Sequence, residues 1–469
     1  MRKTKIIATL GPATSSSSSL EGLLTAGVNV VRINCSHARP DWIRRTVPEV
    51  RAIARRLGVP VGVLLDTQGP SIRTGDVAAS IPLAVGDTFV FTTAGETAAG
   101  VKTTSVSYAD FPRDVEVGRT LLVDNGGIAM RIRSKTETRV ECEVLTEGSM
   151  GSRRHINLPG VRLSLPALTP KDREDVALGL ELGVDFVAQS FVRDPADVAA
   201  LRELTAAANH PVQLVAKIEH QFAVDHFEDI AATADAIMVA RGDLGIECPY
   251  EELPIIQRRI VKHCLQVGRP VIVATQMLES MTENPFPTRA EITDVANAVF
   301  EQADAIMLSG ETAAGRYPVE CVRVMDRIAQ RIERSGGANY HEAAEMANAR
   351  EMLVRSAVML ADQLKAAALV VFTRDGRIAR DAAWLRPRVS PIYVFSARDN
   401  LLGNLSLLRG VCPIAMPACE DDPAGSVDGA IGRLRVLGRV RTGDRVVVVL
   451  PHRSSDDNEV EAVKMLVIE

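Results

Sequence analysis

Several features that define other classes of protein are missing from this sequence of 469 residues. No apolar run approaches the roughly 18 residues that a membrane-spanning helix requires. The basic residues at positions 2–5 precede an apolar stretch that ends at Gly11-Pro12, which is too short for a secretory signal peptide. Tryptophan occurs only twice, but 46% apolar and 24% charged residues are ordinary for a globular protein. We therefore expect a cytoplasmic protein that does not bind membranes.

An excess of positive charge is also missing. The 54 Lys and Arg residues are outnumbered by 59 Asp and Glu residues, which gives a net charge of −5. Because nucleic-acid binding relies on basic surfaces, we expect no nucleic-acid partner. The seven cysteines are an odd number and include no C-x-x-C pair. This pattern favours free thiols in a reducing compartment over a disulfide framework or a zinc site.

The common nucleotide-binding loops are absent as well. The chain contains neither G-x-x-x-x-G-K-[ST] nor G-x-G-x-x-G, so any nucleotide is bound by another kind of fold. Instead, the sequence shows eight buried strands, mostly separated by enough residues for a loop, a helix and a loop. They are expected at residues 5–10, 29–36, 61–66, 185–191, 213–219, 236–243, 270–277 and 305–311. Eight such units predict a parallel (β/α)8 TIM barrel in the α/β class.

The rhythm of the barrel is interrupted once, between the third and fourth strands. Residues 170–182 supply the missing helix, and the residues before it form short alternating runs at 87–93, 120–124, 127–132 and 139–145. Such runs are typical of antiparallel strands. We predict a β-barrel lid domain over residues 71–166, inserted at the rim where barrel enzymes have their active sites. The barrel itself then comprises residues 1–70 and 167–336.

The chain beyond the eighth strand follows another pattern. A helix at residues 318–334 ends near Ser335-Gly-Gly, which suggests a boundary. A long helix up to Leu364 follows, with strands at residues 368–373, 392–396 and 445–450. This order predicts a separate C-terminal α/β domain over residues 337–469.

Two strand ends near the middle of the chain carry the densest charge. Lys217 and Glu219 are expected to share one strand face, and so are Arg241 and Asp243. Two neighbouring carboxylates are costly unless a cation lies between them. Mg²⁺ is usually held by one or two protein carboxylates, with water and substrate phosphate completing the shell. The alternative is a structural salt bridge at the barrel rim.

The other strand ends are polar too. Arg32, Asn34 and Ser36 alternate along the second strand, and Asp66 and Thr67 end the third. Asn, Ser and Asp side chains with a backbone carbonyl are oxygen ligands of low charge, which suits a monovalent cation better than zinc. The positive side chains of Arg32, Arg73 and Lys217 are expected to face the Mg²⁺ site. Positive side chains beside a Mg²⁺ ion are the groups that phosphoryl transfer requires.

Six motifs at these strand ends resemble the signatures of the pyruvate kinase family. They occupy residues 32–37, 65–73, 216–219, 238–245, 274–281 and 307–313, and residues 151–160 resemble the end of that family's lid domain. The resemblance covers essentially the whole chain. It implies transfer of a phosphoryl group from phosphoenolpyruvate to ADP, giving pyruvate and ATP. It also implies Mg²⁺ or Mn²⁺, a K⁺ ion and a homotetramer.

The resemblance assigns roles to individual residues. The Mg²⁺ ligands are Glu219 and Asp243, and the catalytic residues are Arg32, Lys217 and Thr275. Substrate-binding positions are Arg32, Lys217, Gly242, Asp243, Thr275 and Ser309. Positions of the K⁺ site are Asn34, Ser36, Asp66 and the carbonyl of Thr67. Positions that bind ADP are Asn34, Ser36, His37, Arg73 and Arg154 of the lid.

The chain departs from the family at several places, and Gln68 and Arg154 stand where lysines are common. Ser71 stands where the family has glutamate or lysine, so the strength of the K⁺ requirement stays open. In the C-terminal domain, Thr373, Arg374, Gly376 and Arg377 match a loop that binds the phosphate of an effector, a sugar phosphate or a nucleotide, at a helix start. Asp375 replaces a hydroxyl residue there, as does Ile378. Because the carboxylate of Asp375 would repel a phosphate, we predict weak or no activation by fructose 1,6-bisphosphate.

Two other functions are compatible with a barrel of this kind. A Mg²⁺-dependent lyase or aldolase could act on an enolate without any nucleotide, although Arg154 of the lid and the K⁺-type cluster argue against it. A non-catalytic metabolite sensor could keep the fold. Such a sensor should have lost Lys217, Glu219, Asp243 or Thr275, and all four are present.

Overall fold

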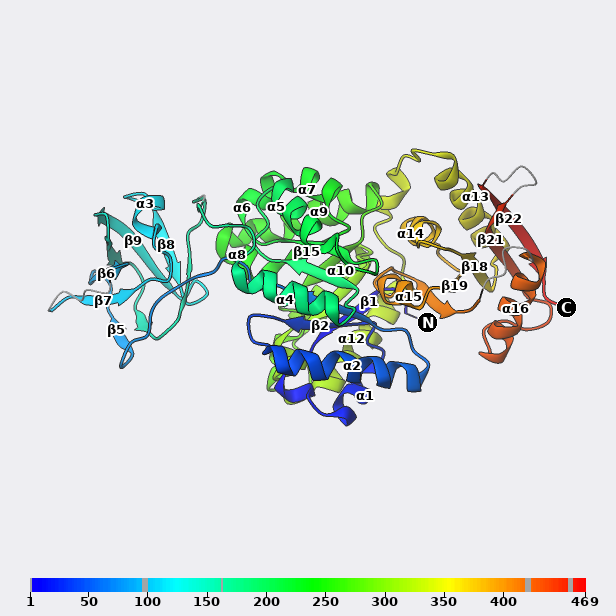
Figure 1. Ribbon diagram of the computed structural model, residues 1–469, viewed down its shortest axis with the longest axis horizontal. Helices are drawn as coiled ribbons and strands as arrows, with labels where there is room; N and C mark the ends of the chain where they lie inside the picture. Colours follow the sequence, from blue (N-terminus) through cyan, green and yellow to red (C-terminus); the bar gives the residue numbers. More distant parts are fainter. Residues whose placement is uncertain (1, 95–99, 162, 418–422, 454–458) are drawn as a thin grey trace.

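The computed structural model describes residues 2–94, 100–161, 163–417, 423–453 and 459–469. Within these residues, eight parallel strands close into a barrel at the centre of the molecule (Figure 1). The TIM barrel predicted from the sequence is therefore confirmed. In the order in which they pair around the barrel, the strands are β1 (Lys5–Thr9), β17 (Ala305–Leu308), β16 (Val271–Ala274), β15 (Ala236–Ala240), β14 (Gln213–Ile218), β13 (Phe186–Gln189), β3 (Gly62–Asp66) and β2 (Val30–Asn34).

Helices surround the barrel, and apolar residues fill its inside. The barrel interior holds Ile7, Val30, Leu64, Phe186 and Ile272, all buried. The surrounding helices are α1 (Ser17–Thr25), α2 (Pro40–Leu57), α4 (Pro170–Glu181), α5 (Pro195–Thr205), α6 (Gln221–Asp225), α7 (Phe227–Thr233), α8 (Arg241–Glu247), α9 (Leu253–Gln266), α10 (Arg289–Phe300), α11 (Gly310–Ala313) and α12 (Pro318–Glu333), with 3-10 turns η1 (Pro12–Thr14), η2 (Tyr250–Glu252) and η3 (Glu279–Thr282).

The insertion between β3 and α4 forms a second sheet, which lies beside the barrel in Figure 1. Seven strands of the described chain pair in the order β4 (Ile72–Arg73), β12 (His155–Asn157), β8 (Thr120–Val123), β9 (Ile128–Lys135), β10 (Arg139–Val144), β6 (Thr88–Thr92) and β7 (Lys102–Ser105). A bridge between Thr74 and Val106 joins its two edges. A smaller sheet pairs β5 (Ile81–Leu83) with β11 (Gly148–Met150), and α3 (Phe111–Asp114) lies between β7 and β8.

The four strands predicted for the insertion correspond to β6, β8, β9 and β10, but the pairing is not purely antiparallel. The strand β7, which the sequence analysis missed, runs parallel to β6. We call these two inserted sheets together the inserted module. The predicted domain limits at residues 70/71, 166/167 and 336/337 stay predictions.

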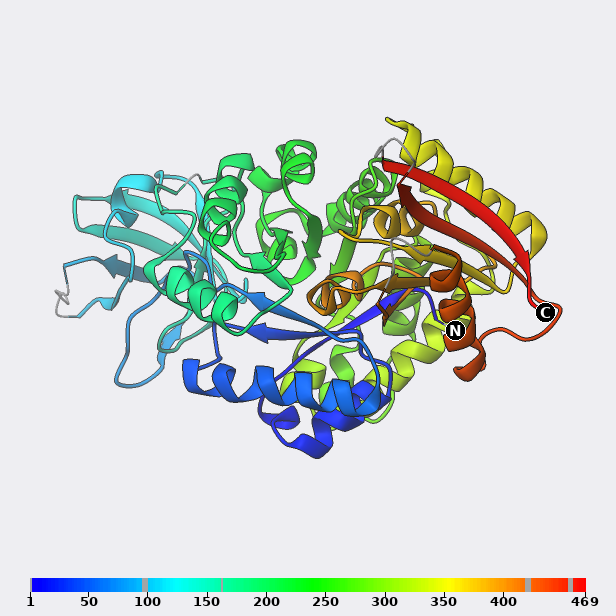
Figure 2. The same cartoon turned by 45° about the vertical axis from the view of Figure 1, so that its right-hand side comes forward.

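The C-terminal part of the chain builds a third layer. Five described strands pair in the order β20 (Val411–Ala415), β19 (Ile392–Ser396), β18 (Ala368–Phe372), β21 (Arg445–Arg453) and β22 (Glu459–Val467), and only β22 is antiparallel. The accompanying helices are η4 (Tyr340–Ala343), α13 (Ala349–Leu364), α14 (Arg377–Trp384), α15 (Asp399–Leu405) and α16 (Pro423–Val436). Figure 2 shows α13 lying along β21 and β22.

Two of these strands, β20 and β22, were not predicted. Pro413 interrupts the apolar pattern of β20, and a proline is tolerated there because β20 is an edge strand. The layer also contacts the barrel, since Leu407 belongs to the buried cluster that fills the barrel interior. The C-terminal sheet is thus anchored at the amino-terminal end of the barrel.

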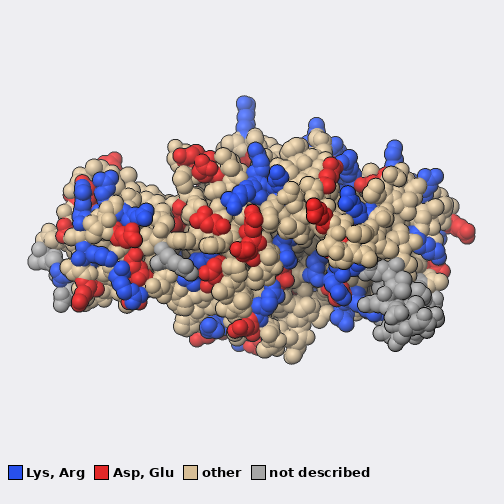
Figure 3. Space-filling view, turned by 90° about the horizontal axis from the view of Figure 1, so that it is seen from above, with Lys and Arg blue, Asp and Glu red and all other residues tan. Residues whose placement is uncertain are grey.

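The surface and the cysteines agree with the composition. Acidic and basic side chains are interspersed over the face shown in Figure 3, as the small net charge suggests. Six cysteines are free thiols, and Cys419 lies outside the described residues. Among the residues described, no helix is both long and apolar enough to cross a membrane.

Candidate active site

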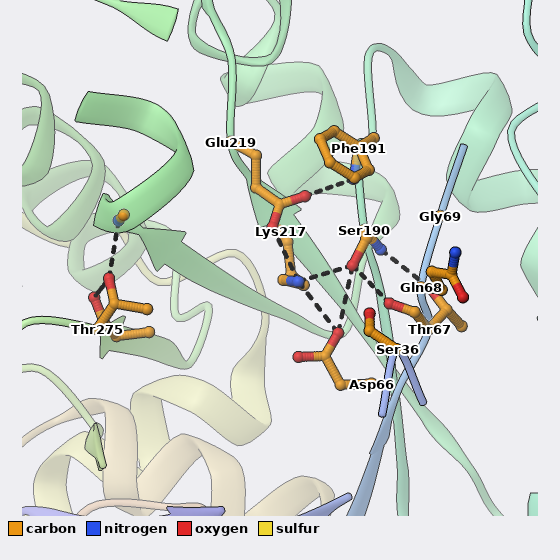
Figure 4. A network of polar contacts seen from close by, with 12 residues as sticks. Ser36, Asp66, Thr67, Gln68, Gly69, Ser190, Phe191, Lys217, Glu219 and Thr275 are labelled. Atoms are coloured by element: carbon orange, nitrogen blue, oxygen red, sulfur yellow. Dashed lines mark hydrogen bonds and ion pairs between the residues drawn. The ribbon is translucent and has the colours of Figure 1, made fainter. Parts of the chain in front are cut away.

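A buried lysine lies at the centre of the polar groups at the carboxyl ends of the barrel strands. Lys217 of β14 places its Nζ 2.8 Å from Oε1 of Glu219 and 3.1 Å from Oδ1 of Asp66. The same Nζ donates to Oγ of Ser190, at 2.6 Å. Figure 4 shows the Lys217 side chain between the two carboxylates. The alternation of a strand therefore brings Lys217 and Glu219 together, as predicted.

The cluster is buried, so its charges are balanced among its own members. Lys217 is 8% exposed, Glu219 1% and Asp66 0%. Burial alone would lower the pKa of Lys217, but the facing Asp66 and Glu219 outweigh it and raise that pKa above its usual value. Lys217 and Arg32 overcome the effect of burial on Asp66 and lower its pKa. Lys217 is thus held as a charged ammonium.

Glu219 is less completely neutralised than Asp66. Burial raises its pKa, and the neighbouring Asp243 adds to the effect, although Lys217 opposes both. Its Oε2 accepts a hydrogen bond of 2.6 Å from the backbone N–H of Phe191. A carboxylate whose pKa is raised by burial and by a neighbouring carboxylate belongs to a set of oxygens suited to a further cation.

Arg32 lies on the other side of Asp66. Its Nε is 2.6 Å from Oδ2 of Asp66, and its NH1 donates to Oγ1 of Thr9 at 3.0 Å. Asp66 consequently holds two cations at once, which fixes the separation between the guanidinium of Arg32 and the ammonium of Lys217.

An open cavity of about 390 Å³ covers this cluster. Its lining joins barrel residues to residues of the inserted module, so it lies where the two meet. Of the residues predicted for the site, the cavity is lined by Arg32, Asn34, Ser36, His37, Thr67, Arg73, Arg154, Lys217, Glu219 and Asp243. Asp66 lies beneath them, whereas Gly242, Thr275 and Ser309 are outside this lining.

Arg241 and Asp243 do not share a strand face, so this prediction is wrong. The strand β15 ends at Ala240, and both residues belong to the first turn of α8. Successive helical residues turn by about 100°, which sends two residues that are two apart in different directions. Asp243 lines the cavity, while Arg241 points away and binds Asp294 at 2.6 Å.

Thr275 has a strained backbone at the end of β16. Its φ is +67°, a left-handed conformation that a β-branched residue rarely adopts. Its Oγ1 accepts a hydrogen bond of 2.8 Å from the N–H of Gly242, and also donates to the carbonyl of Ala274 at 2.6 Å. Arg241 contributes as well, since its NH2 donates to the carbonyl of Thr275. Strain retained in this way is typical of functional positions.

Two residues that the sequence analysis missed support the cluster. Ser190 Oγ accepts from Lys217 and donates to the carbonyl of Thr67 at 2.7 Å, and Phe191 supplies the N–H that binds Glu219. The polar residue at the end of the predicted fourth strand was the available signal for Ser190. No sequence pattern indicated that Phe191 would act through its backbone, with a φ of +55°.

The positions predicted to bind K⁺ and ADP surround Arg32. Oδ1 of Asn34 accepts a hydrogen bond of 3.1 Å from the N–H of Ser36. Ser71 lines the same cavity as Lys217. A second, larger cavity of about 790 Å³ adjoins, because Arg32, Asn34 and His37 line both cavities. Ser309 and Trp42 also line the larger one.

The two lid arginines predicted to bind ADP belong to the inserted module. Arg73 of β4 donates from NH1 to the carbonyl of Arg153 at 3.1 Å. Arg154 is 3.0 Å from Oδ1 of Asp124. Both side chains line the same cavity as Lys217, so the inserted module and the barrel contribute basic groups to one space.

The predicted effector loop lies far from this site, at the start of α14. Oγ1 of Thr373 accepts a hydrogen bond of 2.9 Å from Gly376, whose φ is +85°. The carboxylate of Asp375 accepts the N–H of Arg377 at 2.9 Å and forms an ion pair with the same side chain. The anion at this helix start is therefore supplied by the chain itself.

One hydrogen bond joins the inserted module to the helix that carries Asp243. Nδ2 of Asn157 in β12 donates to Oε1 of Glu247 at 2.8 Å, at the end of α8. Burial is the main cause that raises the pKa of Glu247 to about 7; the hydrogen bond from Asn157 opposes this rise, and Asp243 adds to it. Glu247 therefore binds a proton more tightly in the folded chain than in the unfolded one.

Glu247→Gln is expected to change how stability depends on pH. In the wild type the folded state keeps a proton up to about pH 7, whereas an unfolded glutamate loses it near pH 4.3. Wild-type stability should therefore fall relative to the variant between pH 5 and pH 8, by about 2.5 kcal/mol. Thermal unfolding of both proteins in metal-free buffer measures this difference, and parallel pH profiles would contradict it.

The comparisons with known proteins agree with this geometry. A family model described as "Pyruvate kinase, barrel domain" matches residues 1–322, and one described as "Pyruvate kinase, alpha/beta domain" matches residues 351–463. Pyruvate kinase from Bacillus licheniformis is 40% identical over 459 residues, which cover 96% of this chain and 77% of that protein.

Two further relatives show similar likeness. Pyruvate kinase from Clostridium acetobutylicum is 37% identical over 481 aligned positions, covering 100% of both chains. Pyruvate kinase from Staphylococcus haemolyticus is 37% identical over 462 residues, covering 96% of this chain and 77% of that protein. By these matches over nearly its full length, and with the barrel and its charged strand ends in place, the chain belongs to the pyruvate kinase family.

Proposed function

We propose that the chain transfers the phosphoryl group of phosphoenolpyruvate to ADP in the cavity above Lys217. The observation that carries this proposal is the buried ammonium of Lys217, held between Asp66 and Glu219 and open to a cavity shared with Arg32 and Asp243. Phosphoryl transfer depends on positioned positive charge more than on covalent help. The relatives matched over most of the chain are named pyruvate kinases, which favours this function over a lyase or a sensor.

Glu219 and Asp243 are the residues that would hold Mg²⁺ or Mn²⁺. Their chemistry fits, because they are two carboxylates in one cavity and Asp243 raises the pKa of Glu219. A divalent cation bound there neutralises negative charge on the phosphoryl oxygens. Phe191 and Lys217 hold Glu219 in place through hydrogen bonds to its two oxygens.

The chain's own residues supply the remaining steps. Arg32 and Lys217 bind the phosphoryl group while its bond to the enolate oxygen breaks and a bond to the terminal oxygen of ADP forms. Lys217 also stabilises the enolate, which becomes pyruvate when its terminal carbon takes up a proton. Thr275, with Gly242 and Asp243, borders the carboxylate of the substrate and the path of that proton. Ser309 is the further substrate-binding candidate.

The larger cavity is suited to the nucleoside of ADP. Trp42 is half-buried in its wall and Pro12 lies in the same lining, so a base could stack on the indole ring. Asn34, Ser36 and His37 lie on the barrel side, while Arg73 and Arg154 face them from the inserted module. These five residues would hold the phosphates of ADP between the two parts of the protein.

Asn34, Ser36, Asp66 and the carbonyl of Thr67 are the proposed ligands of K⁺. They are oxygen donors with a single full charge, which suits a monovalent cation. Ser71 adds neither a carboxylate nor an ammonium to this set. We propose that K⁺ raises activity here without being strictly required.

Exposed apolar side chains support self-association. Tyr250 of η2 is 82% exposed, Ile255 of α9 is 61% exposed, and Phe286, in the loop between η3 and α10, is 77% exposed. Exposed apolar groups of this size commonly mark protein interfaces. We propose a homotetramer, in the cytoplasm, as the working form of the enzyme.

The direct test is pyruvate formation from phosphoenolpyruvate and ADP with Mg²⁺, measured with and without K⁺. Turnover is expected in both arms and should be faster with K⁺. Lys217→Met should lower kcat by about 10²–10³-fold, because it removes the charge that faces the transferring group. Lys262→Met, on the exposed face of α9, is the matched control and should keep wild-type kcat.

Each arm of this assay has a contrary outcome. A folded wild type without turnover, with or without sugar phosphates, would overturn the kinase function. Equal losses in Lys217→Met and Lys262→Met would show that Lys217 has no special role. Turnover only with K⁺ would leave the kinase function intact. It would refute only the proposal that an enzyme with Ser71 works without K⁺.

Fructose 1,6-bisphosphate is expected to activate the enzyme weakly or not at all. Asp375 already occupies the amino terminus of α14 with its carboxylate, where it would repel a phosphate. The half-saturating concentration of phosphoenolpyruvate should change less than twofold when the effector is added. A several-fold drop in that concentration would refute the prediction and leave Thr373, Arg374, Gly376 and Arg377 as an effector site.

A further inference from the structure

Another cavity, lined by basic residues, lies at the opposite end of the barrel from the active site. It has a volume of about 110 Å³ and is lined by Lys3, Arg386 and Arg409 among other residues. Lys3 precedes β1, Arg386 follows α14, and Arg409 lies between α15 and β20. Figure 1 shows the amino terminus beside α15, where the barrel meets the C-terminal sheet. We call this space the junction cavity.

Both arginines of the junction cavity are buried and incompletely bonded. Arg386 is 4% exposed and Arg409 is 5% exposed. Arg386 binds Asp304 through NH1 at 2.9 Å and NH2 at 2.6 Å, and Arg409 is 3.8 Å from Glu333. Yet the Nε of each arginine has no hydrogen-bond partner among the residues described. A buried donor without a partner is costly unless a ligand or solvent accepts its proton.

Asp304 and Glu333, the carboxylates that contact the two arginines, do not offset the positive charge at the cavity. Asp304 is already bound by the backbone amides of Val271 at 3.1 Å and Arg409 at 3.2 Å. Glu333 likewise accepts the backbone N–H of Lys3 at 2.8 Å and of Thr4 at 2.7 Å. Their negative charge is thus shared with backbone donors, while three cations line the cavity.

Other charges nearby leave the balance positive. Asp362 also faces Lys3, but it is bound by the backbone amides of Arg388 at 2.8 Å and Val389 at 2.9 Å. Lys5, another buried cation, donates to the carbonyl of Val411. Lys3 itself donates to the carbonyls of Pro387 and Arg388, which pins its ammonium at the cavity wall.

The pKa values of the surrounding groups report the same positive field. Burial and the nearby Arg386 lower the pKa of Arg409 to about 10. Burial, together with Arg386, Arg388 and Arg409, lowers the pKa of His341 to about 4. Burial and Arg409 also lower the pKa of Lys3. In each case burial is the main cause of the lowered pKa, and the positive charge crowded at this junction adds to it.

We propose that the junction cavity binds a phosphate group, held by Lys3, Arg386 and Arg409. The volume equals that of about three to four water molecules, which is enough for one tetrahedral group of four oxygens. Guanidinium groups bind phosphate oxygens through strong charge-assisted hydrogen bonds, and both arginines line the cavity. The phosphate is either the free ion or the end of a small phosphomonoester.

Such a phosphate would connect three segments that are remote in sequence. Lys3 leads into β1, whose Thr9 accepts a hydrogen bond from Arg32 in the active site. Arg386 and Arg409 belong to the C-terminal sheet side of the junction. A ligand that binds only the assembled junction stabilises it by mass action, and so fastens the C-terminal sheet to the barrel.

The test is hydrogen exchange of the full chain with and without inorganic phosphate, together with calorimetric titration. Phosphate is expected to slow exchange at residues 386–391 and 409–411. Lys3→Gln, which removes one charge, and Arg409→Lys, which keeps the charge but loses the guanidinium group, should each weaken phosphate binding at least tenfold. Arg388→Gln is the matched control, because Arg388 is exposed and paired with Glu342, and it should bind phosphate like the wild type.

A second ligand distinguishes a site for free phosphate from a site for phosphomonoesters. Glycerol 3-phosphate giving the same protection as inorganic phosphate would identify a site for phosphomonoesters, and protection by inorganic phosphate alone would identify a site for the free ion. No protection at the junction, or equal binding by all four proteins, would mean that the cavity holds only water and would overturn the proposal. Protection confined to the segments around Lys217 would also overturn it, since the phosphate would then lie in the active site.

Discussion

The active-site half of the barrel depends on one buried chain of charges, from Arg32 through Asp66 and Lys217 to Glu219. Each carboxylate in it is shared by groups from different strands, since Asp66 ends β3 while Arg32 and Lys217 belong to β2 and β14. Buried charges are tolerated only when they are paired and hydrogen-bonded, and here each satisfies the next. The strand ends are therefore held in one arrangement before any substrate arrives.

The chain of charges also determines which groups of the site are positive and where a divalent cation is attracted. Lys217 stays protonated because two carboxylates face it, so it presents a fixed positive charge to the cavity. Glu219 is left with the least complete neutralisation, and that is where a divalent cation would be most strongly attracted. Preorganised charge of this kind costs no rearrangement during the reaction, which is the main source of electrostatic catalysis.

Much of this could be predicted from the sequence because barrel strands leave a simple pattern. Buried apolar runs that end in Lys217, Asp66 or Arg32 indicated both the strands and their polar ends, and the strands lie where they were expected. The arrangement of Arg241 and Asp243 could not be obtained in this way, because β15 stops at Ala240 and the chain turns directly into α8. A short apolar run does not show where strand becomes helix.

Backbone contributions were beyond the sequence for a different reason. The N–H of Phe191 binds Glu219 from a backbone with a φ of +55°, and the strained Thr275 forms hydrogen bonds with Gly242 and Arg241. These are tertiary effects that no residue type announces. Lys3, Arg386 and Arg409 likewise lie on three segments that are remote in sequence. The sequence therefore did not indicate that their positive charges line one cavity.

Mn²⁺ binding to Glu219→Gln and Lys217→Met, followed by electron paramagnetic resonance, shows directly whether Glu219 holds the divalent cation. If Glu219 is the carboxylate that holds the divalent cation, Glu219→Gln should weaken Mn²⁺ binding at least tenfold. Lys217→Met should still bind Mn²⁺, because both carboxylates remain. Glu203→Gln, at an exposed position of α5, serves as the control. If Glu219→Gln kept the wild-type affinity for Mn²⁺, Glu219 would not be the carboxylate that holds the divalent cation.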